Sequence, residues 1–390
     1  MKEGRIALIV LVVGLPIVAA VTFLTYVLNA PPLHPDPQAV GSVMKSAPPA
    51  RWSGAAEAGR QIIRPRLTEQ NLPGLSVAVG VGDDIVWAEG FGWADIETHA
   101  PVAPDTRFRI GHASKSLTSA AVGLLLEKRL LRLDAEIQTY VPAFPAKQWP
   151  VTLRQVMGHV GGVRHYRDTE WGDKPTVRCE RASDGLQFFA SDPLLFEPGT
   201  QYRYSTYGWV LVSAAVEAAA HEPFFDFMRR QVFTPLGMAD TAADFPSEHV
   251  PNRSTSYYRQ LERERTSDVD YSCFAGAGAF LSTPSDLVRF GMALGRGKFL
   301  QSDTVRMLQS PQQLLSGEET SYGLGWMLDT VDLAGEPARL VSHASRTIEG
   351  ASTSFLTFPD RGLFVTVMAN ISFADTRSIA LGIADAFARR

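Results

Sequence analysis

The sequence predicts an α+β fold in which both ends of one domain contribute strands to an antiparallel sheet and a helical region lies between them. Runs rich in β-branched and aromatic residues stand near both ends: Leu75–Val81, Ile85–Phe91, Tyr322–Asp329, Ser352–Phe358 and Leu363–Ala369. Runs with helical periodicity fill the middle, among them Ser114–Leu131, Tyr207–Ala220 and Phe224–Val232. We expect the two sets of strands to pair into one sheet, with helices packed on it.

Taken in order, the first two strand runs form a predicted hairpin, because the turn cluster Gly82-Asp83-Asp84 separates them. The run Ser114–Leu131 is apolar nearly all round, which predicts a helix buried on most sides. Asp375–Arg389 can close the chain as an amphipathic helix.

Composition excludes several classes of function. The chain has 390 residues, a formal net charge of −4 and no concentration of Lys or Arg, so nucleic acid is not an expected partner. Its two cysteines, Cys179 and Cys273, lie outside any metal-binding spacing. They could pair in an oxidising compartment or remain as thiols, and the sequence leaves both open.

The segment 6–28 is an uncharged stretch of 23 residues. As a helix it would span roughly 34 Å, which is enough to cross a bilayer. Lys2 and Arg5 precede it, so residues 1–5 are predicted inside and the rest of the chain outside, on the periplasmic side in a bacterium. A cleaved signal peptide is the alternative, but the stretch is longer than usual and Pro31 follows the best cleavage point, after Ala30. The sequence therefore predicts a single-pass membrane protein.

Residues 29–50 contain six prolines and are predicted to form an extended tether. From residue 51 the composition becomes globular, without an internal repeat or a second low-complexity stretch. One domain is therefore expected over residues 51–390.

The first motif that carries chemistry lies at residues 108–118, which read FRIGHASKSLT. It resembles the first active-site box of serine β-lactamases, penicillin-binding carboxypeptidases and related esterases, in which a Ser precedes a Lys by three residues at the start of a buried helix. Residues i and i+3 share a helix face, so the amine can take the proton of the hydroxyl. In this register Lys115 stands at the family lysine and His112 at the family nucleophile. Ser114 cannot take over, because Lys115 is its immediate neighbour.

A second box is present at residues 197–208, EPGTQYRYSTYG. By resemblance, Tyr204 would relay a proton to the leaving group, and Thr206 replaces the commoner Asn among the substrate-binding residues. We expect Lys115 Nζ and Tyr204 Oη to lie within hydrogen-bond reach across the floor of the pocket.

The third box of the family, on a strand at the sheet edge, is Lys or His followed by Thr and Gly. Residues 342–350 here read SHASRTIEG. His343 matches, whereas Ala344 and Ser345 depart from Thr and Gly, and Glu349 stands where relatives often have Gly. The resemblance implies that the backbone N–H groups of residues 112 and 346 form the oxyanion hole, with Ser345 and Arg346 contacting substrate.

Longer runs support the same resemblance. Residues 158–166 (GHVGGVRHY) and 274–287 (FAGAGAFLSTPSDL), together with the Tyr-Ser-Thr box, are similar to the animal mitochondrial lactamase-like serine proteases. The matches run from about residue 70 to 370. The chain is therefore identified as similar to the β-lactamase and penicillin-binding-protein family, including its class C β-lactamase and DD-carboxypeptidase branches, and the resemblance implies the β-lactamase/transpeptidase-like fold.

The resemblance leaves two functions open. The chain could act on an amide or ester, such as a D-Ala-ending peptide, a β-lactam or a small ester, with His112 in place of the serine. Alternatively it is a pseudoenzyme that serves as a binding or filament-type assembly module, which the departures at Ala344, Ser345 and Glu349 favour. A metal site at His112, His343 and His159 lacks a carboxylate ligand by spacing, so neither a metal nor a cofactor is expected.

Overall fold

The computed structural model describes residues 32–389 except 168–169, 171–177, 260–262, 267–268 and 348–349. Its main sheet is antiparallel and has the strand order β1-β3-β2-β13-β12-β11-β10, with β4 paired to β3. The strands are β1 (Ser42–Met44), β2 (Gly74–Val81), β3 (Asp84–Asp95), β4 (Ala100–Pro101), β10 (Met327–Leu333), β11 (Glu336–Thr347), β12 (Ala351–Phe358) and β13 (Leu363–Ala369). Because β2 pairs with β13, the two chain ends meet in one sheet, as the sequence predicts.

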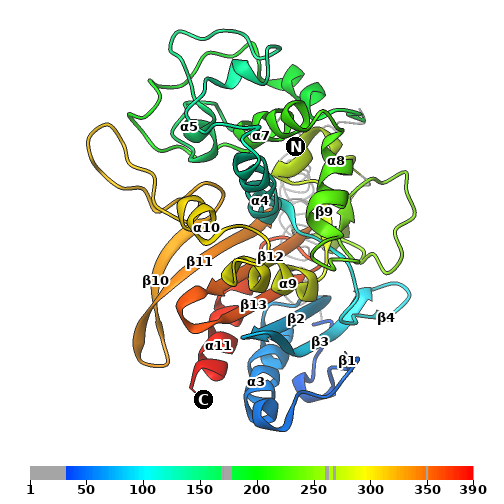
Figure 1. The fold of residues 1–390 in the computed structure, drawn as a ribbon. Helices are drawn as coiled ribbons and strands as arrows, with labels where there is room; N and C mark the ends of the chain where they lie inside the picture. The colour runs from blue at the N-terminus through cyan, green and yellow to red at the C-terminus, as the bar shows by residue number, and fades with distance from the viewer. Residues whose placement is uncertain are drawn as a thin grey trace, which may run out of the picture.

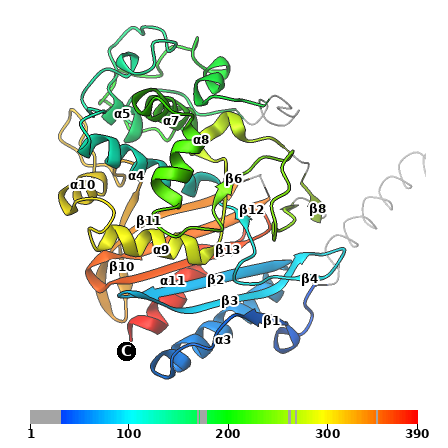
Figure 2. The same cartoon turned by 45° about the vertical axis from the view of Figure 1, so that its right-hand side comes forward.

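Helices cover both faces of this sheet (Figures 1 and 2). On one face α3 (Ser53–Glu69) and α11 (Thr376–Ala388) pack against Val77 and Val79 of β2. On the other face α9 (Pro284–Gly295) contacts Ala78 through Val288 and Met292. Since successive side chains of a strand point to opposite faces, a strand covered on both sides is apolar throughout, and β2 is buried from Gly74 to Gly80.

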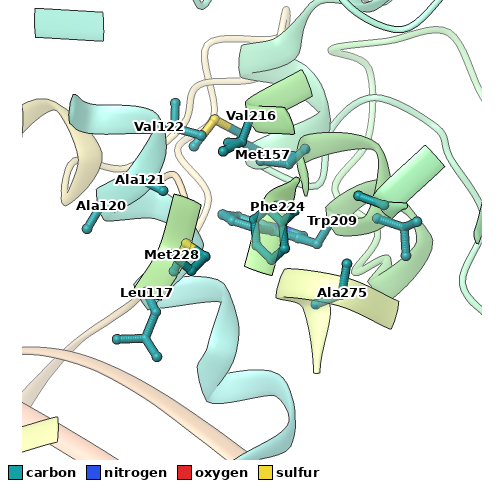
Figure 3. Close-up of a cluster of buried hydrophobic side chains, with 14 of the residues drawn as sticks. Leu117, Ala120, Ala121, Val122, Met157, Trp209, Val216, Phe224, Met228 and Ala275 are labelled. Atoms are coloured by element: carbon teal, nitrogen blue, oxygen red, sulfur yellow. The ribbon is translucent and has the colours of Figure 1, made fainter. Parts of the chain in front are cut away.

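The middle of the chain forms a helical region above the sheet, with the apolar cluster of Figure 3 at its centre. The central helix α4 (Ser114–Glu127) is buried on most sides and contacts α7 (Thr206–Ala220) and the 3₁₀ segment η8 (Ser272–Ala277). Around them lie α5 (Leu153–Met157), η6 (Ala182–Phe188), α8 (Phe224–Phe227), the π-helical η7 (Met228–Phe233) and α10 (Ser302–Leu308). This cluster fixes the first turn of α4 relative to the first turn of α7.

Two smaller strand groups complete the fold. One has the order β5-β9-β6, from β5 (Phe108–Arg109), β9 (Phe280–Ser282) and β6 (Ala242–Ala243). The other pairs β7 (Tyr257–Arg259) with β8 (Arg263–Arg265). Short 3₁₀ segments stand at η2 (Pro37–Ala39), η3 (Ala50–Trp52), η4 (Gly111–Ala113), η5 (Ile137–Thr139) and η9 (Pro359–Arg361).

The segment predicted as an extended tether packs on the domain over the part that the structure describes, residues 32–50. His34 is buried and its Nε2 lies 2.9 Å from the carbonyl of Pro73, while Leu33 N donates to Asn71 Oδ1. Further on, β1 pairs with β3. These contacts hold Leu33, His34 and β1 against the domain, and the boundary at residue 51 stays a prediction.

The predicted membrane localisation is corrected. Among the residues that the structure describes, no helix is long and apolar enough to cross a membrane. The apolar helices α4 and α7 have only 14 and 15 residues and are buried within the domain, whereas a span needs about 20. The predicted anchor at residues 6–28 and the terminus before it lie outside the described residues. A single-pass location therefore has no support in the structure.

Cys179 and Cys273, whose pairing the sequence leaves open, form a disulfide. The bond joins the segment that precedes η6 to η8, across 94 residues of sequence. Both residues are buried. The bridge therefore links two parts of the helical region that also pack against α7.

Candidate active site

The candidate site is built where α4 and α7 begin. Gly111 has φ +47°, a conformation that a side chain would strain, and η4 leads from it directly into α4. At the start of α7, Ser205 caps the helix by accepting a hydrogen bond from Gly208 N at 2.9 Å. These two helix starts face each other and bring the predicted residues together.

One hydroxyl connects the first and second boxes. Thr206 Oγ1 lies 3.1 Å from Nε2 of His112 and 3.4 Å from Nζ of Lys115. His112 and Lys115 therefore reach the same atom, as expected for residues three apart on one helix face. Because Lys115 donates to Thr206 Oγ1, the hydroxyl hydrogen of Thr206 can point at Nε2 of His112.

Lys115 is fully buried, and each of its described contacts is polar or aromatic. Nζ also donates to the carbonyl of Ala277 in η8 at 3.2 Å. It lies 4.9 Å from the centroid of the Tyr204 ring, within the range of a cation–π contact. The structure thus brings Lys115 and Tyr204 together, while the hydrogen bond expected between Nζ and Oη stays a prediction.

His112 is a neutral imidazole in this setting. Burial of the ring, and next the charge of Lys115, lower its pKa well below 6.5, and the neighbouring histidines act in the same direction. The residue keeps partial solvent exposure, and its ring centroid lies 5.7 Å from that of Tyr204. His112 can therefore offer one nitrogen as an acceptor and the other as a donor near neutral pH.

The serines next to Lys115 do not replace the missing nucleophile. Ser114 and Ser116 are both fully buried. Ser116 Oγ donates to the carbonyl of Gly325 at 3.0 Å. Both hydroxyls therefore lie inside the domain.

The third box lies on β11, where pairing with β10 ends at Ser342. Beyond that point β11 pairs with β12 alone in the described register, from His343 to Thr347, so this stretch is the sheet edge that the site requires. Ser345 Oγ accepts a hydrogen bond from the backbone N–H of His112 at 3.2 Å. The N–H group predicted as an oxyanion donor is thus engaged by Ser345. The side chain of Arg346 and all of Glu349 lie outside the described residues.

His343, the residue that matches the third box, lies inside the fold. It is fully buried, with Nε2 3.1 Å from the hydroxyl of Tyr322 and Nδ1 3.2 Å from the carbonyl of Ala344. Burial, and next the charge of Lys115, lower the pKa of His343 to about 3. Burial also keeps the pKa of Tyr322 well above 10, so its hydroxyl can donate to Nε2. Both ring nitrogens are engaged within the fold, and the catalytic role of His343 stays a prediction.

Sequence reasoning missed Tyr322, because it falls in an apparent strand run and no motif spacing connects it to His343. Two histidines of the segment 158–166 accept hydrogen bonds from backbone N–H groups at the start of α7. His159 Nδ1 accepts from Ser205 N at 3.1 Å, and His165 Nδ1 accepts from Thr206 N at 3.0 Å. Among the described residues, no group of three or more His, Cys, Asp or Glu side chains could hold a metal ion.

Comparison with known proteins agrees with this geometry. Residues 60–388 match the family described as Beta-lactamase. The chain is 29% identical to the mouse serine beta-lactamase-like protein LACTB, mitochondrial, over 90% of this chain and 84% of that protein. It is 27% identical to penicillin-binding protein 4* of Bacillus subtilis, over 76% and 67% of the two chains. The octameric penicillin-binding protein homologue from Pyrococcus abyssi has a similar structure, with a TM-score of 0.72 at 20% identity over 84% and 76%.

Proposed function

The chain belongs to the beta-lactamase family, and on that premise we propose that it binds an amide or ester substrate without forming an acyl-enzyme. The family acts on such substrates, peptides and β-lactams among them. The observation that supports the proposal is the contact of His112 Nε2 with Thr206 Oγ1, because the resemblance assigns the attacking hydroxyl to position 112 and an imidazole stands there.

The chemistry of the site supports binding without acylation. Acyl transfer in this family needs an oxygen nucleophile beside the lysine, and both serine hydroxyls near Lys115 are buried. The imidazole of His112 is larger than a hydroxymethyl group and is engaged with Thr206, so it fills space that a substrate carbonyl would otherwise approach. Tyr204 and His112, which are partly exposed, remain able to hold the substrate by hydrogen bonds.

Covalent labelling tests the proposal. The wild type should show no mass increase with a fluorophosphonate or a β-lactam, whereas His112→Ser should gain one adduct on the new serine. Lys115→Met in the His112→Ser background is the matched control, since it keeps the serine and removes the base. Binding of a D-Ala-ending peptide to the wild type, measured by calorimetry, should persist without labelling.

Two outcomes would contradict the proposal. Labelling of wild type at His112 or Ser114 would mean that the protein acylates after all. Failure of the wild type to bind peptides, β-lactams or esters would remove the substrate class. A folded His112→Ser variant that stays inert would show that the departures at Ala344, Ser345 and Glu349 also block the reaction, and the binding role would still hold.

The second candidate is an assembly module. The octameric state named for the Pyrococcus abyssi homologue favours it, because a related fold there forms an oligomer. Light scattering on the purified chain separates the two candidates: a concentration-dependent polymer without peptide binding supports assembly, and a monomer that binds peptide supports the binding role.

A further inference from the structure

A polar cavity with a volume of about 470 Å³ lies beside the small sheet β5-β9-β6. Residues of the β6–β7 connection and of β8 line it, and both β6 and β8 lie on the same side of the molecule in Figure 2. Among the described lining residues, Arg109, Arg253 and Arg265 supply three guanidinium groups, against one carboxylate, that of Glu248. None of the residues assigned above to the candidate active site lines this cavity.

The sheet register explains why the first arginine faces the cavity. Arg109 and Ala242 pair with Leu281 from opposite sides, so they share a level of the sheet. Asp244 follows Ala242 by two residues and therefore points to the same face. Arg109 Nε donates to Asp244 Oδ2 at 2.7 Å, and both side chains are almost fully buried, at 5% and 1% exposure.

A second guanidinium uses the same carboxylate. Arg253 forms a parallel β-bridge with Arg107. Arg107 N donates to the carbonyl of Asn252, and Ser254 N donates to the carbonyl of Arg107. This places Arg253 within 2.6 Å of Asp244 Oδ1. Arg109 and Arg253 thus share Asp244, and both line the cavity; the side chain of Arg253 is 20% exposed.

The remaining wall carries further donors. Arg265 lies on β8 and is exposed, and the next residue, Thr266, has its hydroxyl 3.4 Å from Arg109 NH1. Glu248, at the rim, lies 3.7 Å from Arg178 outside the cavity. The carboxylate of Glu248 therefore pairs with Arg178, which does not line the cavity.

We propose that this cavity binds the oxyanion group, phosphate or carboxylate, of a small molecule. Guanidinium groups present paired N–H donors that match the oxygen spacing of both anions. A mostly buried arginine strengthens such contacts, because little water competes for its donors. The volume lies in the range of ordinary small-molecule pockets. This inference is independent of the proposed function at His112.

Calorimetric titration of the full chain tests it. Sodium phosphate and, in a separate arm, sodium acetate are added at constant ionic strength set with sodium chloride. The wild type should bind at least one of them with a saturable one-to-one isotherm. Arg253→Gln/Arg265→Gln should weaken that binding at least about tenfold, since each charge-assisted hydrogen bond contributes to the affinity. Both changes lie at the partly exposed wall and leave the buried Arg109–Asp244 pair in place.

The matched control is Arg66→Gln/Arg306→Gln, which removes two exposed arginines elsewhere, at 50% and 73% side-chain exposure. It should bind as the wild type does. Phosphate binding alone identifies a phosphate-bearing ligand, and acetate binding alone a carboxylate. Absence of saturable binding in both arms, or equal affinities in the wild type and the Arg253→Gln/Arg265→Gln variant, would overturn the proposal.

Discussion

Removing the Cys179–Cys273 disulfide should lower the free energy of unfolding by up to about 4.7 kcal/mol. The bond closes a loop whose ends are 94 residues apart. In the chain-entropy treatment, a loop of that length restricts the unfolded chain by about 16 cal/mol/K, which gives this value at 25 °C. Both cysteines are 2% exposed, so Cys179→Ala/Cys273→Ala places small apolar side chains in apolar surroundings and adds little further cost.

The expected thermal effect follows from the size of the domain. At about 2.1 cal/mol/K of unfolding entropy per residue, a domain of roughly 350 residues loses about 6 °C in Tm for 4.7 kcal/mol. Urea denaturation of the double variant and of wild type, each with and without a dithiol reductant, measures the change. The reductant should shift wild type to the midpoint of the variant and leave the variant unchanged.

One result would refute the reasoning. If mass spectrometry showed both cysteines reduced in the wild type while its denaturation midpoint stayed the same, the bridge would not restrict the unfolded chain as argued. A shift in the double variant on adding reductant would point to an effect of the reductant itself.

Three further predictions concern the site and its supports. The pKa of His343 is about 3 in the folded protein and about 6.5 in the unfolded chain, so the unfolded chain binds a proton first and stability is lost as pH falls from 6.5 toward 3. His343→Gln should therefore reduce the slope of the unfolding free energy against pH by about 1.4 kcal/mol per pH unit. Tyr322→Phe leaves Nε2 of that histidine without its donor and should cost about 1–3 kcal/mol in urea denaturation. Gly276→Ala would make a Cβ clash with Thr118 Oγ1 and should lower stability by about 1–3 kcal/mol, whereas Gly41→Ala, with nothing within 4 Å, should be neutral.

The sheet could be predicted best where strands are buried on both faces. The run Leu75–Val81 coincides with β2 to within one residue, because continuous apolar and β-branched residues have no other favourable place. The strand predicted at Tyr322–Asp329 agrees less well with the structure, since β10 begins at Met327 and continues to Leu333. Four of the seven residues of β10 are exposed, so pairing with β11 rather than burial holds this strand in place.

The proline content of residues 32–50 indicates only a local backbone preference and not the surface on which the segment packs. The contacts that hold this segment are long-range: His34 with Pro73, and β1 with β3. No pattern within the segment identifies these partners. Composition can indicate an extended backbone, but the surface on which it packs depends on residues 30 to 50 positions away.

The site also has one part that the sequence motifs predict and one part that they do not. His112, Lys115 and Thr206 could be placed together from box order alone, because each box fixes a residue at a helix start. The engagement of His343 by Tyr322 could not, since a hydroxyl 21 residues away in sequence decides whether the imidazole is accessible. Local motifs therefore identified which residues converge, and tertiary contacts determined how each is used.

His112 and Ser345, two residues that differ from the family boxes, contact each other. Restoring acylation therefore depends on both positions. By resemblance of the boxes, Ser345 would stand at the family Gly and His112 at the family Ser. In the structure the hydroxyl of Ser345 accepts a hydrogen bond from the backbone N–H of His112. A glycine has no side chain to accept that bond, so the N–H would face the substrate carbonyl. Loss of one oxyanion donor costs about 10²–10³ in rate. His112→Ser alone should therefore acylate slowly, and adding Ser345→Gly should accelerate labelling by up to that factor; equal rates would show that Ser345 leaves the oxyanion hole intact.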